Sequence, residues 1–186
     1  MRNLISFAAF FFLLGSVSVQ AQSDIAKNAL TCSSVYYIAS SLTDDSEESG
    51  DFFIRLQLMF ESIYLAFERE RRDQQITNGM ISDAKSEELI RLGSLYSEQP
   101  KSIYTLEMQC NEWRTDVFPY LLRLIESESE AESESAIMLD VPPMPRVPET
   151  GNVRWAQSKD FMDSAFAKWA EKGTPTPRWV EDELNK

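Results

Sequence analysis

The sequence predicts an all-α protein: a disulfide-linked four-helix bundle, followed by an acidic, proline-rich linker and a C-terminal amphipathic helix. Apolar residues recur at alternating spacings of three and four, which is the period of one helical face. Four segments with this period precede position 127. The only two cysteines, Cys32 and Cys110, lie on the apolar faces of the first and the fourth of these segments.

The first 21 residues have the pattern of a secretory signal peptide. Arg2 precedes an apolar run from Leu4 to Leu14, and the small-residue pattern Val19-Gln20-Ala21 follows. The run is shorter than the about 20 apolar residues of a membrane span, so we expect no stable membrane insertion after cleavage. The mature protein should be periplasmic if it comes from a diderm bacterium, and otherwise secreted.

The first two helices should span 24–42 and 51–75. Ser23 can cap the first by accepting hydrogen bonds from its orphan N–H groups. The second is the most apolar stretch after the signal segment, and we expect it to be central because its apolar residues cover nearly half of its circumference. The predicted core residues are Ile25, Ala29, Cys32, Tyr36 and Ala39 in the first helix, and Phe52, Phe53, Leu56, Met59, Phe60, Ile63, Tyr64 and Phe67 in the second.

A narrow apolar strip of three residues, Ile54, Leu58 and Leu65, lies opposite the broad face of the second helix. Contact with another helix of the bundle is the simpler explanation, because helices of a small bundle are often covered on two sides. The alternative is contact with a partner protein. These three residues are therefore candidate partner-binding residues.

The next two helices are predicted from their boundary residues. Asn78-Gly79 should end the second helix, since both residues tolerate positive φ, and Ser82 should cap a third helix over 83–98. Pro100 suits the first turn of a fourth helix, in which Pro119 should produce a kink. The predicted core residues are Leu89, Leu92 and Tyr96 in the third helix, and Ile103, Leu106, Cys110, Trp113, Val117, Leu121 and Leu124 in the fourth.

Cys32 and Cys110 are predicted to form a disulfide, because an even number of cysteines in an exported chain favours pairing. The bond would hold the first helix beside the fourth. In the chain-entropy model, closing so long a loop stabilises the fold by about 4 kcal/mol. Its role should be structural, since no Cys-X-X-Cys motif is present.

The linker has two parts of different composition. From position 126 onward glutamate alternates with serine or alanine, and this composition predicts an extended, solvated spacer. Four prolines follow within 141–148; they favour polyproline II, and we expect this part to lie as a strap across the bundle. The predicted organisation is a signal peptide (1–21), a helical bundle (22–126), a linker (127–152) and a helical tail (153–186).

The tail helix, predicted over 153–172, places Trp155, Met162, Phe166 and Trp169 on one apolar face. Aromatic anchors are enriched where protein surfaces meet, so this face could bind a groove of a partner protein. It could equally fold back on its own bundle, over Ile54, Leu58 and Leu65, because large apolar patches rarely stay uncovered. The sequence leaves both arrangements open.

Composition excludes several functions. The chain has no histidine, which removes imidazole-dependent catalytic triads and histidine-ligated zinc, copper or haem. We predict no catalytic residue, no metal site and no cofactor. Without Arg2 the chain has 17 basic and 30 acidic residues, a net charge of −13, which repels nucleic acid.

The first functional hypothesis is an exported, non-catalytic interaction or adaptor protein, whose helical scaffold presents the aromatic tail helix to a partner protein in the extracytoplasmic compartment. The second is an acidic chaperone or inhibitor that binds basic clients through its charge. The third is a small carboxylate-dependent hydrolase, for which Glu61 is the candidate because it lies beside the apolar strip.

Overall fold

A computed structural model describes residues 5–42, 47–72, 76, 78–127, 140–148 and 153–172. These residues form five α-helices and no strand: α1 (Ile5–Ser40), α2 (Glu47–Arg72), α3 (Asn78–Glu98), α4 (Pro100–Ser127) and α6 (Val153–Lys172). The predicted all-α class is confirmed, and α6 has the predicted bounds. Most of the acidic spacer, 128–139, lies outside the described residues.

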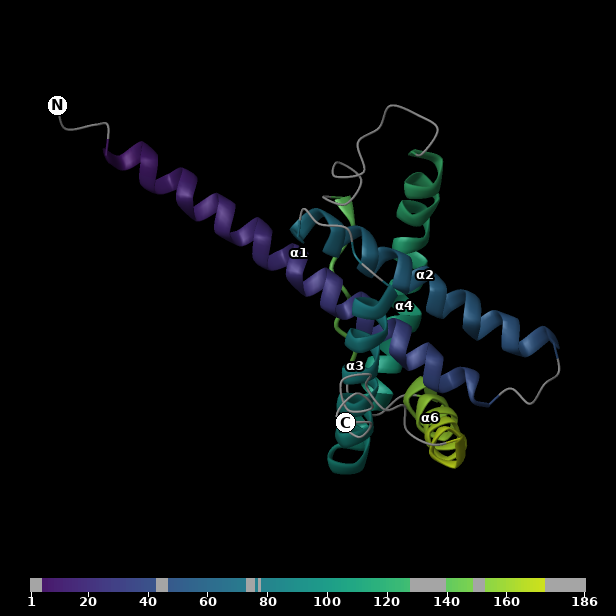
Figure 1. Ribbon diagram of the computed structural model, residues 1–186. Coiled ribbons are helices and arrows are strands. Elements are labelled where there is room, and N and C mark those ends of the chain that lie inside the picture. Colours follow the sequence, from purple (N-terminus) through teal and green to yellow (C-terminus); the bar gives the residue numbers. More distant parts are fainter. Residues whose placement is uncertain are drawn as a thin grey trace, which may run out of the picture.

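The central helix is α1, which contacts α2, α3, α4 and α6 (Figure 1). From Ile25 to Ser40 its side chains are buried or half-buried, apart from the exposed Lys27. The prediction that the second helix is central is wrong, because α2 leaves Phe52 and Ile54 on its surface. The sequence did not indicate that α1 is central, because its small residues do not produce a broad apolar stripe. The same alanines and serines let neighbouring helices approach α1 from all sides.

The helices α1, α2 and α3 all begin earlier than predicted. α1 begins at Ile5, so Ser23 lies inside a helix instead of capping one; no glycine or proline interrupts residues 16–24. The dipeptide Asn78-Gly79 begins α3 instead of ending α2, and Ser82 lies within that helix. Asparagine is also a favoured N-cap residue, so it fits the start of a helix as well as its end.

Two apolar clusters meet along α1. The first contains the core faces of α1 and α2 and the middle of α4. In it, Phe60 of α2 stacks between Tyr36 of α1 and Trp113 of α4, at centroid distances of 5.8 and 5.4 Å. The second joins Val35 and Ile38 of α1 to α3, the beginning of α4 and α6. The predicted core stripe of α4 is confirmed at Ile103, Cys110, Trp113 and Val117, which are buried; Leu106 and Leu121 are half-buried, and the helix continues through Pro119.

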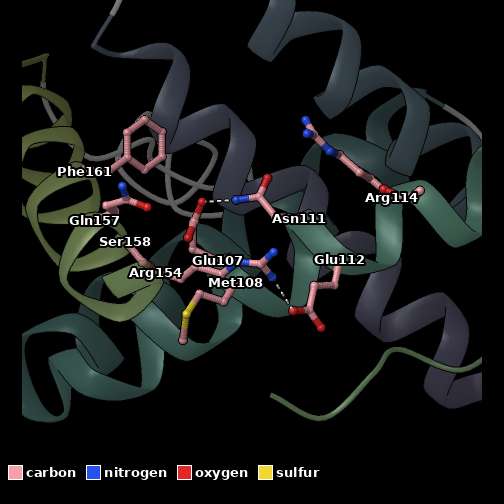
Figure 2. Close-up of a pocket in the computed structure, with 10 residues that line it drawn as sticks. Glu107, Met108, Asn111, Glu112, Arg114, Arg154, Gln157, Ser158 and Phe161 are labelled. Carbon is pink, nitrogen blue, oxygen red and sulfur yellow. Dashed lines mark hydrogen bonds and ion pairs between the residues drawn. The ribbon is translucent and has the colours of Figure 1, made fainter. Parts of the chain in front are cut away.

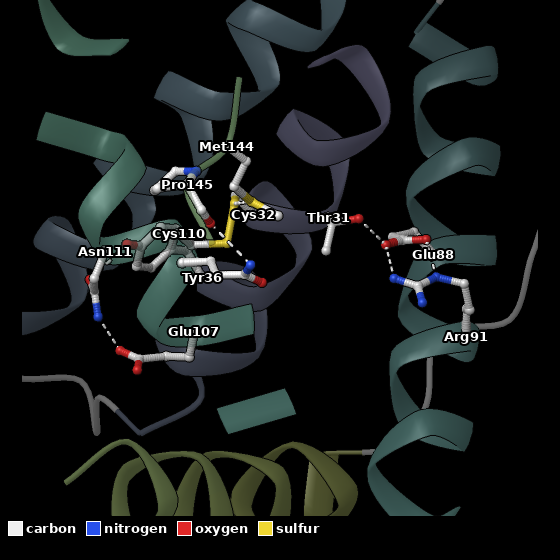
Figure 3. Close-up of a disulfide and its surroundings, with 11 residues drawn as sticks. Thr31, Cys32, Tyr36, Glu88, Arg91, Glu107, Cys110, Asn111, Met144 and Pro145 are labelled. Atoms are coloured by element: carbon white, nitrogen blue, oxygen red, sulfur yellow. Dashed lines mark hydrogen bonds and ion pairs between the residues drawn. A yellow bond between two sulfur atoms is a disulfide. The ribbon is translucent and has the colours of Figure 1, made fainter. Parts of the chain in front are cut away.

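A disulfide joins Cys32 of α1 to Cys110 of α4, with a Cα–Cα distance of 5.5 Å (Figure 3). This confirms the predicted pairing. Both cysteines are fully buried. The bond closes a sequence separation of 78 residues, so it restricts the unfolded chain strongly.

The proline-rich segment crosses the bundle over this disulfide, as predicted for a strap. Met144 places its sulfur 3.8 Å from the Cys32 sulfur, a van der Waals contact because neither sulfur carries a hydrogen. Trp113 Nε1 donates a hydrogen bond to the Pro142 carbonyl at 2.8 Å, and Gln109 Nε2 donates to the Pro145 carbonyl at 3.0 Å. Side chains of α4 therefore bind backbone acceptors of the strap, whose prolines have no N–H to offer.

A buried carboxylate holds α3 against α1. Glu88 accepts a hydrogen bond from the Thr31 hydroxyl at 2.5 Å and two from the Arg91 guanidinium at 2.6 and 2.7 Å (Figure 3). Burying a carboxylate is unfavourable unless its charge is paired and its oxygens accept hydrogen bonds. Both conditions are met here, so this contact fixes the position of α3 along the central helix.

We predict that replacing both Cys32 and Cys110 by alanine lowers the free energy of unfolding by about 4 kcal/mol, because the unfolded chain regains the freedom of the closed loop. Denaturant unfolding monitored by circular dichroism measures the change. Reduction of the unmodified protein is the control, since it breaks the bond without removing the sulfur atoms. Equal unfolding midpoints for the oxidised and reduced proteins would show that the bond does not stabilise the fold.

Candidate functional site

The apolar face of α6 packs against its own chain. Met162, Ala165, Phe166 and Trp169 are buried in the second cluster, against α1, α3 and α4. Phe166 stacks on Tyr96 with a centroid distance of 4.1 Å. Of the two arrangements that the sequence left open, the structure has the folded-back one, but α6 does not lie over the strip on α2 as we had expected.

The other aromatic contacts of α6 explain its position. Trp169 lies against Gly93 of α3, where an added Cβ would come within 3.4 Å of the indole ring. Trp155 is half-buried and meets Tyr104 edge-on, with a centroid distance of 5.6 Å. The Trp169 indole ring therefore packs directly on the α3 backbone at position 93.

A single carboxylate fixes the register of α6. Asp163 accepts hydrogen bonds from the hydroxyls of Tyr96 at 2.8 Å and Tyr104 at 2.6 Å, and from Lys159 at 2.7 Å. Burial alone would raise the pKa of Asp163, but the three hydrogen bonds outweigh that effect and hold the pKa below its ordinary value. Burial and this carboxylate together raise the pKa of Tyr96 to about 12.

The strap restricts how far α6 can move. Only residues 149–152 separate the described end of the strap, Pro148, from Val153, so the intervening chain spans at most about 17 Å. The acidic spacer comes earlier, between α4 and the strap, and the Arg123–Asp140 ion pair at 3.3 Å links the two sides of that segment. The spacer therefore does not lie between the strap and α6.

Ile54 and Leu58 have exposed fractions of 45% and 50%, whereas Leu65 is half-buried against the first cluster. The simpler explanation of the strip, contact with another helix, therefore holds for Leu65 only. Ile54 and Leu58 lie one turn apart on the outer face of α2. We call this pair the α2 strip.

Glu61, the candidate for carboxylate chemistry, forms an ion pair with Lys85 at 2.9 Å. Lys85 also lies over the ring of Tyr37, 5.2 Å from its centroid. These contacts connect α2, α3 and α1. Glu61 thus has a structural partner that accounts for its position.

A cleft of about 480 Å³, missed in the sequence analysis, opens between α4 and α6 (Figure 2). Glu107, Asn111 and Arg114 of α4 line it on one side, and α6 contributes Arg154, Ser158 and Phe161 on the other. The sequence contained one signal for it. Glu107 is an acidic residue directly beside the core stripe of the fourth helix, where an unpaired charge is unfavourable.

Glu107 belongs to a hydrogen-bonded chain that crosses from α1 to α6. The Tyr36 hydroxyl donates to Asn111 Oδ1 at 2.8 Å, and Asn111 Nδ2 donates to the Glu107 carboxyl (Figures 2 and 3). The Ser158 hydroxyl donates to the Tyr104 carbonyl at 2.8 Å and also lies within hydrogen-bonding reach of Glu107.

Burial raises the pKa of Glu107, and the opposing effects of Ser158, Asn111 and Arg114 do not cancel this shift. Burial also raises the pKa of Tyr36. Ser158 and Asn111 therefore stabilise the charged form of Glu107, but by less than burial destabilises it.

We predict that Asp163→Asn destabilises the protein by about 1 to 2 kcal/mol at neutral pH, because two tyrosines and Lys159 lose a charged acceptor. The folded-state pKa of Asp163 is lowered, so its contribution to stability is present above the ordinary carboxyl range and is lost as the pH falls through the folded-state value. Denaturant unfolding at several pH values measures this. The matched control is Asp160→Asn, an exposed aspartate on the same helix. Equal losses in the two variants would contradict a specific role for Asp163.

We predict that Glu107→Gln gains stability relative to the unmodified protein as the pH rises from about 4 to 8. The folded-state pKa is raised, so ionising Glu107 opposes folding, and this penalty grows as the pH passes from the unfolded-state to the folded-state pKa. Urea unfolding across this range measures the difference. Glu112→Gln, a more exposed change on the same helix, is the control. A stability difference that does not vary with pH would contradict the raised pKa.

Neither a metal cluster among the described residues nor a known relative indicates a function. Within the described ranges, no cluster of three or more cysteine, aspartate or glutamate side chains could hold a metal ion. No helix in the described part of the chain is both long enough and apolar enough to cross a membrane. No family model, no curated protein and no solved structure matches the chain. The function must therefore be inferred from the side chains of this protein alone.

Proposed function

We propose that the protein is an exported, non-catalytic interaction protein that binds a partner protein through the α2 strip. One observation carries this proposal: Ile54 and Leu58 stay about half exposed although α6, which could have covered them, packs elsewhere. Scattered apolar residues are normal on a surface. Two large aliphatic side chains in register on a helix, however, form the kind of anchor that fits a groove or another helix.

The scaffold behind the α2 strip supports this proposal. The opposite face of α2 buries Phe60 and Ile63 in the first cluster, and the disulfide fixes α1 and α4 around that cluster. A surface on a rigid helix loses little conformational freedom when it binds, so more of the contact energy appears as affinity. The strip is thus better prepared for binding than the same residues would be on a loop.

The expected partner is a basic protein with an apolar contact surface. The net charge of −13 after removal of the signal segment attracts positive partners over short range and speeds their encounter. The buried disulfide supports export, since such bonds persist in oxidising compartments. The proposed compartment is the periplasm if the source is a diderm bacterium, and otherwise the exterior.

The face of α6 is not the proposed binding surface. Its apolar residues Met162, Phe166 and Trp169 already fill the second cluster, and exposing them would break the hydrogen bonds of Asp163. A partner would have to offset both losses. The α2 strip requires no such rearrangement.

We predict that replacing Ile54 and Leu58 by serine abolishes capture of the partner in a crosslinking pull-down from the extracytoplasmic fraction, while the fold stays intact. Both residues are exposed, so stability should change by only about 0.5 kcal/mol. The bait is the mature protein, whose N-terminus, read by mass spectrometry, should be Gln22. The captured protein should be basic, and its capture should decrease as the salt concentration is raised, because salt screens the attraction between the two proteins.

The matched control replaces Phe118 and Leu122, another exposed apolar pair one turn apart, on α4. This variant should capture the same protein as the unmodified bait. Undiminished capture by the α2 variant would overturn the proposal. If only the α4 variant lost capture, the interface would have to be assigned to α4 instead of α2.

A further inference from the structure

We infer that the cleft between α4 and α6 binds a small organic carboxylate that has an aromatic or other apolar body, with Arg114 as the residue that binds the carboxylate. This site is separate from the α2 strip and does not depend on the proposed partner. The inference follows from which hydrogen-bonding groups in the cleft are already used within the chain and which are not.

Arg114 has donors that its contacts do not use. Its guanidinium carbon lies 5.6 Å from the centroid of the Phe52 ring, and no ion pair between Arg114 and a carboxylate occurs in the described part of the chain. A cation–π contact uses the face of a guanidinium, whereas its N–H donors lie along the edge. A planar carboxylate can accept two of these donors side by side.

The two carboxylates that line the cleft are already engaged. Glu112 pairs with Arg154 at 3.1 Å. Glu107 accepts from Asn111 and lies against Ser158, and its burial makes ionisation less favourable. A cationic ligand would have to break one of these contacts or ionise a buried carboxyl. An anionic ligand would not.

A second donor lies beside Arg114. Asn111 uses its Oδ1 for Tyr36 and one N–H for Glu107, and an amide nitrogen has two hydrogens. Asn111 and Arg114 are neighbours on α4, separated by three positions, so both lie on the same side of that helix. Asn111 therefore has one N–H that neither of these two contacts uses.

The apolar part of the ligand would lie against Phe161 and Met108, which also line the cleft (Figure 2). Phe161 is held in place by the ring of Phe53, at a centroid distance of 5.6 Å. The volume of about 480 Å³ falls within the range of small-molecule sites. These features favour a compact molecule with one anionic end and one apolar end.

The test uses three probes of nearly equal shape: benzoate, the neutral benzamide and the cationic benzamidine. Each is titrated into the oxidised mature protein, and amide chemical shifts are followed by NMR. We expect saturable shifts in 107–115 and 154–161 with benzoate, and binding at least about tenfold weaker with the other two, because they lack the charge that Arg114 binds. Stronger binding of benzamidine, or no saturable shift with benzoate, would overturn the inference.

Variants then locate the anion. Arg114→Gln should weaken benzoate binding about tenfold or more. The matched control is Arg123→Gln, which removes an arginine that also lies over an aromatic ring, Tyr120, but does not line the cleft. If Arg114→Gln perturbs the fold, Arg114→Lys is the second variant, because it keeps the positive charge. It should bind benzoate more weakly than the unmodified protein and Arg123→Gln do, but binding should still be measurable. Equal weakening by Arg114→Gln and Arg123→Gln would also overturn the assignment.

Discussion

The structure depends on the place where α1, α4 and the strap meet, which is the Cys32–Cys110 disulfide. The bond fixes the central helix against α4, and the next turn of α4 places Trp113 where its ring fills the first cluster and its N–H binds the strap. Met144 then covers the sulfur atoms. Because the strap leads directly into α6, the position of the last helix also depends on this junction.

The helix α6 is a part of the domain core and not an appendage. It supplies Met162, Phe166 and Trp169 to a cluster that contains residues of α1, α3 and α4. Asp163, at the centre of this contact, binds tyrosines from both α3 and α4, so it positions α6 against two helices at once. A short connection from the strap keeps the chain close to this place, which lowers the entropy lost when the helix packs.

The two proposed surfaces have different physical origins. The α2 strip exists because α2 packs with one face only and its outer side chains remain uncovered. The cleft exists because α6 packs beside α4 and encloses Glu107, Asn111 and Arg114 between the two helices. Their chemistry differs accordingly: the strip offers apolar surface for a protein, and the cleft offers hydrogen-bond donors and one aromatic wall for a small molecule.

The sequence by itself determined the helical class, the disulfide pair, the strap and the bounds of α6. Each depends on local spacing or composition: the period of apolar residues, the number of cysteines, or the backbone preference of proline. It did not determine that α1 is central, that Asn78 begins a helix, that Ile54 and Leu58 stay exposed or that Glu107 is buried in a cleft. Helical period shows which residues share a face, but the number of neighbours that cover the face depends on how separate helices pack. Only the tertiary structure decides this, because small residues such as those of α1 permit close packing without producing an apolar stripe.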